Sequence, residues 1–113
     1  MGAAVMIPYE FQRGETIGLA LDLVKGEAEQ VGDISAALKR VAAGGSAVAP
    51  GTAPAESFAI APAEGGWTMT IDAAQSAALT PGLYRADARI AVGGGIVVTE
   101  PVSIRIAEPV TAP

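Results

Sequence analysis

The sequence contains no cysteine and no histidine. Without cysteine, the chain has no disulfide, no thiol nucleophile and no cysteine-based metal site. Without histidine, it lacks the usual general base near neutral pH and the commonest metal ligand of proteins. We therefore expect no catalytic residues, no cofactor and no bound metal, and a protein that is not an enzyme.

Aromatic residues and positive charges are also scarce. Aromatics make up 4% of a chain that is 50% apolar, and much of the apolar share is alanine, so each large apolar side chain is expected to matter to the core. Seven basic residues stand against twelve acidic ones, which gives a net charge of −5. The cations are spread out, with only Lys39 and Arg40 adjacent. A nucleic-acid partner would need a basic stripe, so none is expected.

No apolar run approaches the roughly 18 residues that a membrane span requires. The first residues carry no positive charge, and Glu10 interrupts any hydrophobic run, so no signal peptide is predicted. Met6 stands where a myristoylation pattern requires serine or threonine. We expect no membrane association.

The 113 residues fit a single domain spanning 1–113. The clearest pattern is residues 16–24, where large apolar residues alternate with small or polar ones, as in a half-buried strand. One face of this strand carries Ile17, Leu19, Leu21 and Leu23. Similar segments predict strands at 57–61, 67–71, 83–92, 96–99 and 102–106, with a further short one at 5–11. Turn signals recur about every ten residues, which is typical of a β-sandwich.

Residues 34–41 fit two patterns. Ile34, Ala37, Leu38 and Val41 have helical spacing, with Asp33 as an N-cap. Ile34, Ala36 and Leu38 also fit strand alternation. The all-β context favours the strand.

Turn chemistry sets the expected connections. Residues 62–66 are predicted to turn between two strands of a hairpin, and the glycines 93–95 to form a second hairpin turn. Asp72 and Gln75 have the spacing of a capping box, so one helical turn is expected before Pro81 and Gly82 end it. Glu100 and Pro101 interrupt the last strand region.

Two segments are expected outside the core. Residues 42–56 are rich in alanine, glycine and proline and predict a flexible loop, interpreted either as a plain surface loop or as a partner-binding one. Residues 108–113 are expected to form a loosely held tail.

The residues that could carry chemistry have structural interpretations. Asp22, Asp33, Asp72 and Asp87 form no clustered acidic motif and fit solvated strand faces and caps. The serines have no histidine partner, and no Ser-x-x-Lys spacing occurs. Trp67 is predicted to anchor the core beside Ile71, and the alternative is an exposed platform for stacking a sugar.

Residues 79–84, Leu-Thr-Pro-Gly-Leu-Tyr, resemble the tyrosine corner of immunoglobulin and fibronectin-type domains. The resemblance implies that the Tyr84 hydroxyl bonds to backbone just upstream and fixes the entry to a strand. We therefore predict an immunoglobulin-like antiparallel β-sandwich of about seven short strands.

A longer pattern combines Arg13-Gly14-Glu15, the strands at 17–23, 67–71 and 102–106, Asp87 and Thr99. It resembles immunoglobulin-like modules of tailed bacteriophages and prophages, including the N-terminal domain of baseplate upper proteins. The 42–56 loop and the extreme N-terminus lie outside the resemblance.

The resemblance implies a structural component of the virion: an adaptor in the tail, neck, baseplate or fibre attachment, or a capsid decoration. Its partners would be other virion proteins and copies of itself in a cyclic oligomer. Residues 5–11 or 108–113 are expected to make those contacts. The alternatives are a carbohydrate- or surface-binding module and, third, a small enzyme.

Overall fold

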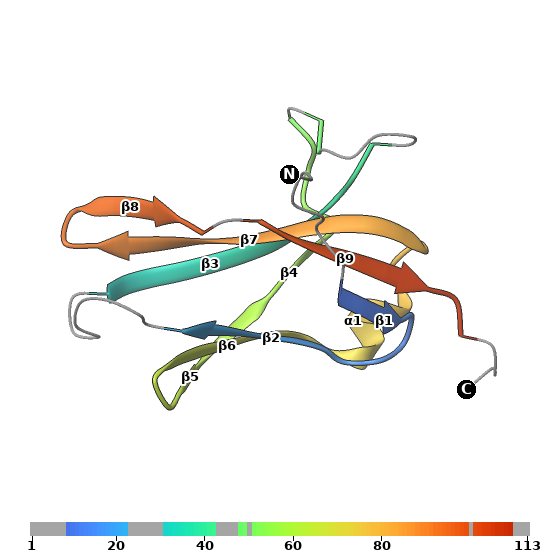
Figure 1. Ribbon diagram of the computed structural model, residues 1–113, viewed down its shortest axis with the longest axis horizontal. Coiled ribbons are helices and arrows are strands. Elements are labelled where there is room, and N and C mark those ends of the chain that lie inside the picture. Colours follow the sequence, from blue (N-terminus) through green and yellow to red (C-terminus); the bar gives the residue numbers. More distant parts are fainter. Residues whose placement is uncertain (1–8, 23–30, 43–47, 50, 100, 110–113) are drawn as a thin grey trace, which may run out of the picture.

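The computed structural model describes residues 9–22, 31–42, 48–49, 51–99 and 101–109, and these form two packed β-sheets with one short helix (Figure 1). The six-stranded sheet has the order β1 (Tyr9–Gln12), β9 (Val102–Ala107), β7 (Gly82–Val92), β3 (Val31–Arg40) and β4 (Glu56–Ser57), and β8 (Gly95–Val98) also pairs with β7. The three-stranded sheet has the order β2 (Ile17–Asp22), β6 (Gly66–Ile71) and β5 (Ala59–Ala63). The predicted all-β sandwich is confirmed.

The strand order is that of an immunoglobulin-like sandwich. The second, sixth and fifth strands form one sheet, and the third, seventh and ninth lie together in the other, as do strands B-E-D and C-F-G of immunoglobulin domains. One pairing departs from the antiparallel expectation, because β1 runs parallel to β9. These are the first and last described strands and no hairpin joins them, so chain connectivity does not force them to be antiparallel.

The core lies between the two sheets and draws on both. The three-stranded sheet contributes Ile17, Met69 and Ile71, and the larger sheet contributes Ala36, Leu38, Tyr84, Ala86, Ala88, Ile104 and Ile106. Leu19 and Leu21 share the inner face with Ile17 but are only partly buried. The alternation predicted for the strands at 16–24, 83–92 and 102–106 is therefore confirmed in the described residues, and Leu23 and Val24 lie outside them.

Trp67 corrects the predicted core. It is half-buried and is not a member of the buried cluster, whereas Tyr84 is 2% exposed and is the largest fully buried side chain of the described residues. Trp67 pairs with Leu21 and Pro62 beside the β5–β6 turn, at the end of the small sheet.

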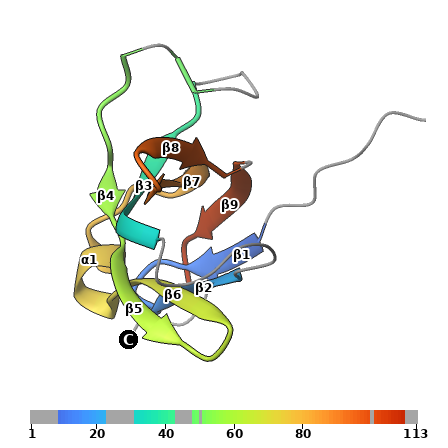
Figure 2. The same cartoon turned by 90° about the vertical axis from the view of Figure 1, so that its left-hand side faces the viewer.

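The sequence predicted a single strand at residues 57–61, but these residues divide between two strands. The chain leaves β4 in one sheet, passes Phe58 and enters β5 in the other, as the continuous green ribbon of Figure 2 shows. Phe58 is buried at the crossing, and its amide donates to the Ala36 carbonyl at 2.9 Å. The buried Phe58 therefore marks the crossing between the sheets, and the alternation of faces expected over 57–61 is interrupted there.

The predicted hairpins both form, each with a turn shorter than predicted. In β5 and β6, Pro62 still pairs with Trp67 and Ala63 with Gly66, so the turn is Glu64-Gly65 rather than residues 62–66. Pro62 fits because β5 is an edge strand, where a missing N–H removes no ladder bond. Between β7 and β8, Gly95 already pairs with Val92, so the turn is Gly93-Gly94 rather than residues 93–95, with φ values of 53° and 90°.

Residues 34–41 resolve to a strand. β3 pairs along most of its length with β7, with a register shift between Val31 and Ile34. The cross-strand partner, rather than local spacing, decides between helix and strand here. The predicted turn of helix is α1 (Ala73–Ala77), with the capping box of Asp72 and Gln75 in place.

The described ends of the 42–56 loop and of the tail contact the sandwich. In the 42–56 loop, the Ala55 amide donates to the Leu38 carbonyl at 2.7 Å, so the chain has already rejoined β3 before Glu56. Glu108 forms an ion pair with Arg13. Tyr9 to Gln12 pair with β9, so part of the 5–11 segment builds the sandwich. Residues 5–8, 43–47, 50 and 110–113 lie outside the described residues.

Candidate functional site

The candidate acids lie apart from one another. Asp33 is exposed on β3, Asp72 caps α1 by accepting from the Gln75 amide at 2.8 Å, and Asp87 points away from the core on β7. The backbone of Asp22 pairs with Gly66, and its side chain lies outside what the structure describes. Within the described residues, no group of three or more acidic side chains comes close enough to hold a metal ion.

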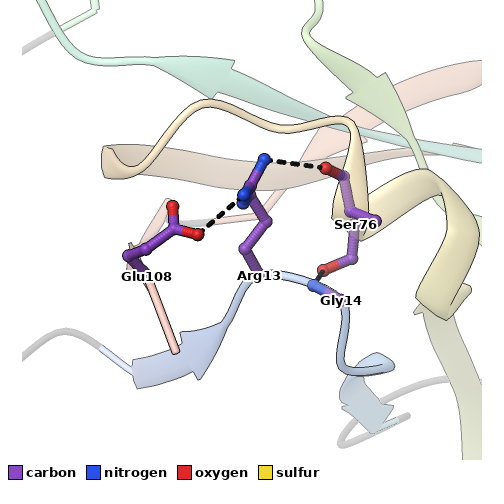
Figure 3. Close-up of polar contacts among 5 residues, drawn as sticks. Arg13, Gly14, Ser76 and Glu108 are labelled. Carbon is purple, nitrogen blue, oxygen red and sulfur yellow. Dashed lines mark hydrogen bonds and ion pairs between the residues drawn. The ribbon is translucent and has the colours of Figure 1, made fainter. Parts of the chain in front are cut away.

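Ser76 is a candidate serine with a clear structural role. Its side chain is 0% exposed, and its hydroxyl accepts from the Gly14 amide at 3.1 Å (Figure 3). Beside it, the Arg13 guanidinium donates to the Ala77 carbonyl at 3.3 Å and to Glu108 at 2.6 Å. This cluster ties the β1–β2 turn to α1 and to the segment after β9.

The tyrosine corner is present as the resemblance implied. The Tyr84 hydroxyl donates to the Thr80 carbonyl at 2.6 Å. Gly82 precedes Tyr84 with a φ of 148°, a conformation that favours glycine. The hydrogen bond fixes the turn that leads from α1 into β7.

Arg40, at the end of β3, completes this corner and was not anticipated from the sequence. Its guanidinium donates to the Thr80 carbonyl at 3.3 Å, the Tyr84 hydroxyl at 3.2 Å and the Pro81 carbonyl at 3.0 Å. It also lies 5.5 Å from the centre of the Tyr84 ring, within cation–π range. The sequence shows Arg40 only as a cation at the end of a predicted strand, and this position does not predict which groups it binds.

A hollow of about 440 Å³ opens between the sheets beside β2. Its apolar lining includes Leu19, Leu21, Met69 and Val102, and Asp87 and Thr99 also line it. Tyr9 stands at its rim and is 55% exposed. The predicted structural leucines therefore border an open space as well as the core.

Three of the four exposed large hydrophobic side chains in the described part of the chain lie on one strand, and the fourth is Tyr9. On β8, Ile96 is 58% exposed, and Val97 and Val98 are each 52% exposed. Consecutive residues of a strand point to opposite faces, so β8 is apolar on both sides. Figure 1 shows it at the end of the molecule away from the C-terminus, paired with the distal half of β7.

No described helix is both long enough and apolar enough to cross a membrane. No protein-family model matches this chain. No curated protein matches it either.

Proposed function

We propose that this protein is a non-enzymatic, immunoglobulin-like adaptor of a tailed-phage or prophage particle. It would serve in tail, neck, baseplate or fibre attachment, or as capsid decoration, and would hold other virion proteins and copies of itself. The observation that carries the proposal is the exposed apolar strand β8 on an otherwise well-tied sandwich. An edge of this kind pairs readily with a further chain.

The chemistry of the described residues supports a binding role over catalysis. The buried hydroxyls of Ser76 and Tyr84 are engaged with backbone groups, and the candidate aspartates are dispersed over caps and strand faces. A nucleophile needs a base within hydrogen-bond reach. The Ser76 and Tyr84 hydroxyls instead fix turns.

The test is the mass of the protein in solution together with its presence in particles. Particles induced from a strain that encodes the chain are purified and analysed by mass spectrometry, and the purified protein is examined by light scattering. We expect the protein to be a stoichiometric particle component and to form a closed oligomer. A monomer that is absent from purified particles would contradict the proposal.

A carbohydrate- or surface-binding module is the second candidate, favoured by Tyr9 at the rim of the hollow between the sheets. Exposed aromatic rings are the usual stacking platforms for sugars, and Trp67 is half-buried. A glycan array with the purified protein and with Tyr9→Ala separates the two candidates. Specific glycan binding that is lost in Tyr9→Ala would favour this second function.

A further inference from the structure

The outer edge of β8, a strand of four residues, lacks the charge, proline and bulge that commonly protect an edge strand. Among the described residues no strand pairs with that edge, and residues 95–98 include no charge, proline or bulge. Natural edge strands commonly carry lysine, proline or a bulge that discourages pairing with other chains. An unprotected edge with more than half of each large side chain exposed is suited to accept an added strand.

The face of the sheet next to β8 carries positive charge. The register places Arg89 opposite Val98, and Arg89 alternates with the buried Ala88, so both Arg89 and Val98 point away from the core. These two side chains line a hollow of about 370 Å³ on that face together with Lys39 and Asp87. Arg85 and Lys39 are opposed across β7 and β3 on the same face.

This charge contrasts with the rest of the molecule. The outer face of β1, β9, β7 and β3 carries the cations Lys39, Arg85, Arg89 and Arg105, and the acids that register places with them are Asp87 and Glu10. One more acid, Asp33, is exposed on β3. The whole chain nevertheless has a net charge of −5. A large share of the few cations is thus gathered on the face that β8 extends.

We propose that the outer edge of β8 binds an extended partner segment in which acidic and apolar side chains alternate. The segment would add a strand to the sheet, with its apolar side chains beside Val97 and its acidic ones on the face of Arg89. Strand spacing places an added strand about 10 Å from β7, a distance that an arginine and a glutamate side chain span together. This inference rests on the proposed function and names its binding site.

A second copy of β8 fits this site less well. It would bring Ile96, Val97 and Val98, with no acidic side chain to meet Arg89. Charge complementarity therefore favours an acidic partner over self-pairing.

The test uses fluorescently labelled synthetic peptides and the full chain at low ionic strength. One peptide alternates valine and glutamate, a second alternates valine and lysine, and a third is the acidic peptide with a central proline. Fluorescence anisotropy is expected to show binding of the acidic peptide, with affinity at least about tenfold lower for the other two. Equal binding of the acidic and basic peptides, or no binding of either, would overturn the inference.

Matched variants locate the site. Val97→Lys places a charge on the edge and should abolish binding, whereas Ala61→Lys, on the exposed edge strand β5 of the other sheet, should not. Arg89→Glu should weaken binding of the acidic peptide about fivefold. Arg105→Glu, at the far end of the same face, should change the affinity for this peptide little. Equal effects of the paired variants would refute the assignment to β8.

Two further measurements separate the possible failures. One outcome is that the wild-type protein is a dimer, that Val97→Lys is a monomer and that no peptide binds. In that case a second copy of the chain occupies β8, and the proposed partner is wrong. If Val97→Lys protein is still incorporated normally into particles, the adaptor function stands and the site is wrong.

Discussion

Two buried hydroxyl groups, those of Tyr84 and Ser76, connect elements that are distant in the sequence. The Tyr84 hydroxyl connects the turn after α1 with Arg40 of β3. The Ser76 hydroxyl accepts a hydrogen bond from the amide of Gly14, which lies between β1 and β2. The Tyr84 and Ser76 side chains are 2% and 0% exposed, and their hydrogen bonds are part-buried. Each hydroxyl therefore acts as a tie between segments and is expected to contribute measurably to stability.

Tyr84→Phe should destabilise the fold by about 1–2 kcal/mol, because the Thr80 carbonyl and the Arg40 guanidinium both lose a buried partner. Urea unfolding followed by circular dichroism measures the loss. Tyr9→Phe is the matched control, since its side chain is 55% exposed, and it should change stability little. An equal effect of the two variants would show that the corner contributes no more than an exposed tyrosine.

Ser76→Ala should cost about 1–3 kcal/mol, because the Gly14 amide would be left without its acceptor in a part-buried position. Ser57→Ala, on an exposed strand position, provides the comparison. Hydrogen exchange adds a local measurement: the Gly14 amide should exchange faster in Ser76→Ala than in the wild type. An unchanged exchange rate at Gly14 would mean that another acceptor binds the Gly14 amide in the variant.

These two residues show how far single positions could be predicted. The Tyr84 contact spans four residues of chain, so a local motif suffices to foresee it. Arg40 and Ser76 act on partners 44 and 62 residues away, and no local spacing encodes such pairs. Trp67 was predicted from its alternation, which gives the face of a strand but not its distance from the end of the sheet.

At the scale of elements, the sequence predicts strands through alternation and turns through glycine and proline, and these signals locate most strands and both hairpins. The sequence does not predict which strands pair with one another. The split of residues 57–61 at Phe58 and the parallel pairing of β1 with β9 depend on which sheet each segment joins. Residues 34–41 were ambiguous for the same reason, and pairing with β7 decides them.

The β7–β8 hairpin depends on its two turn glycines, because both adopt positive φ, the combination that two-residue hairpin turns favour. Gly94→Ala, at a φ of 90°, should cost about 1 kcal/mol and loosen β8. Gly18→Ala is the control, since its backbone needs no positive φ and nothing lies within 4 Å of the added methyl group. Amide exchange in β8 should rise only in Gly94→Ala, and equal protection in both variants would contradict the assigned turn.

At the scale of the whole molecule, one hydrophobic cluster joins the two sheets. Ile17 and Ile71 come from the small sheet, and Tyr84 and Ile104 from the large one, all within the same cluster. Neither sheet can keep its inner face buried without the other, and a sheet with one exposed apolar face is not stable in water. The described residues should therefore unfold as one cooperative unit.

Trp67 makes this cooperativity measurable, because it reports on the small sheet alone. Far-UV circular dichroism is dominated by the larger sheet, so the two signals follow different parts of the molecule. In urea, both should give the same midpoint and the same slope, as two-state unfolding requires. Tyr84→Phe, a change in the large sheet, should lower both midpoints equally. If the Trp67 signal instead kept its wild-type midpoint, the sheets would be separable, and the shared core would not be what holds them together.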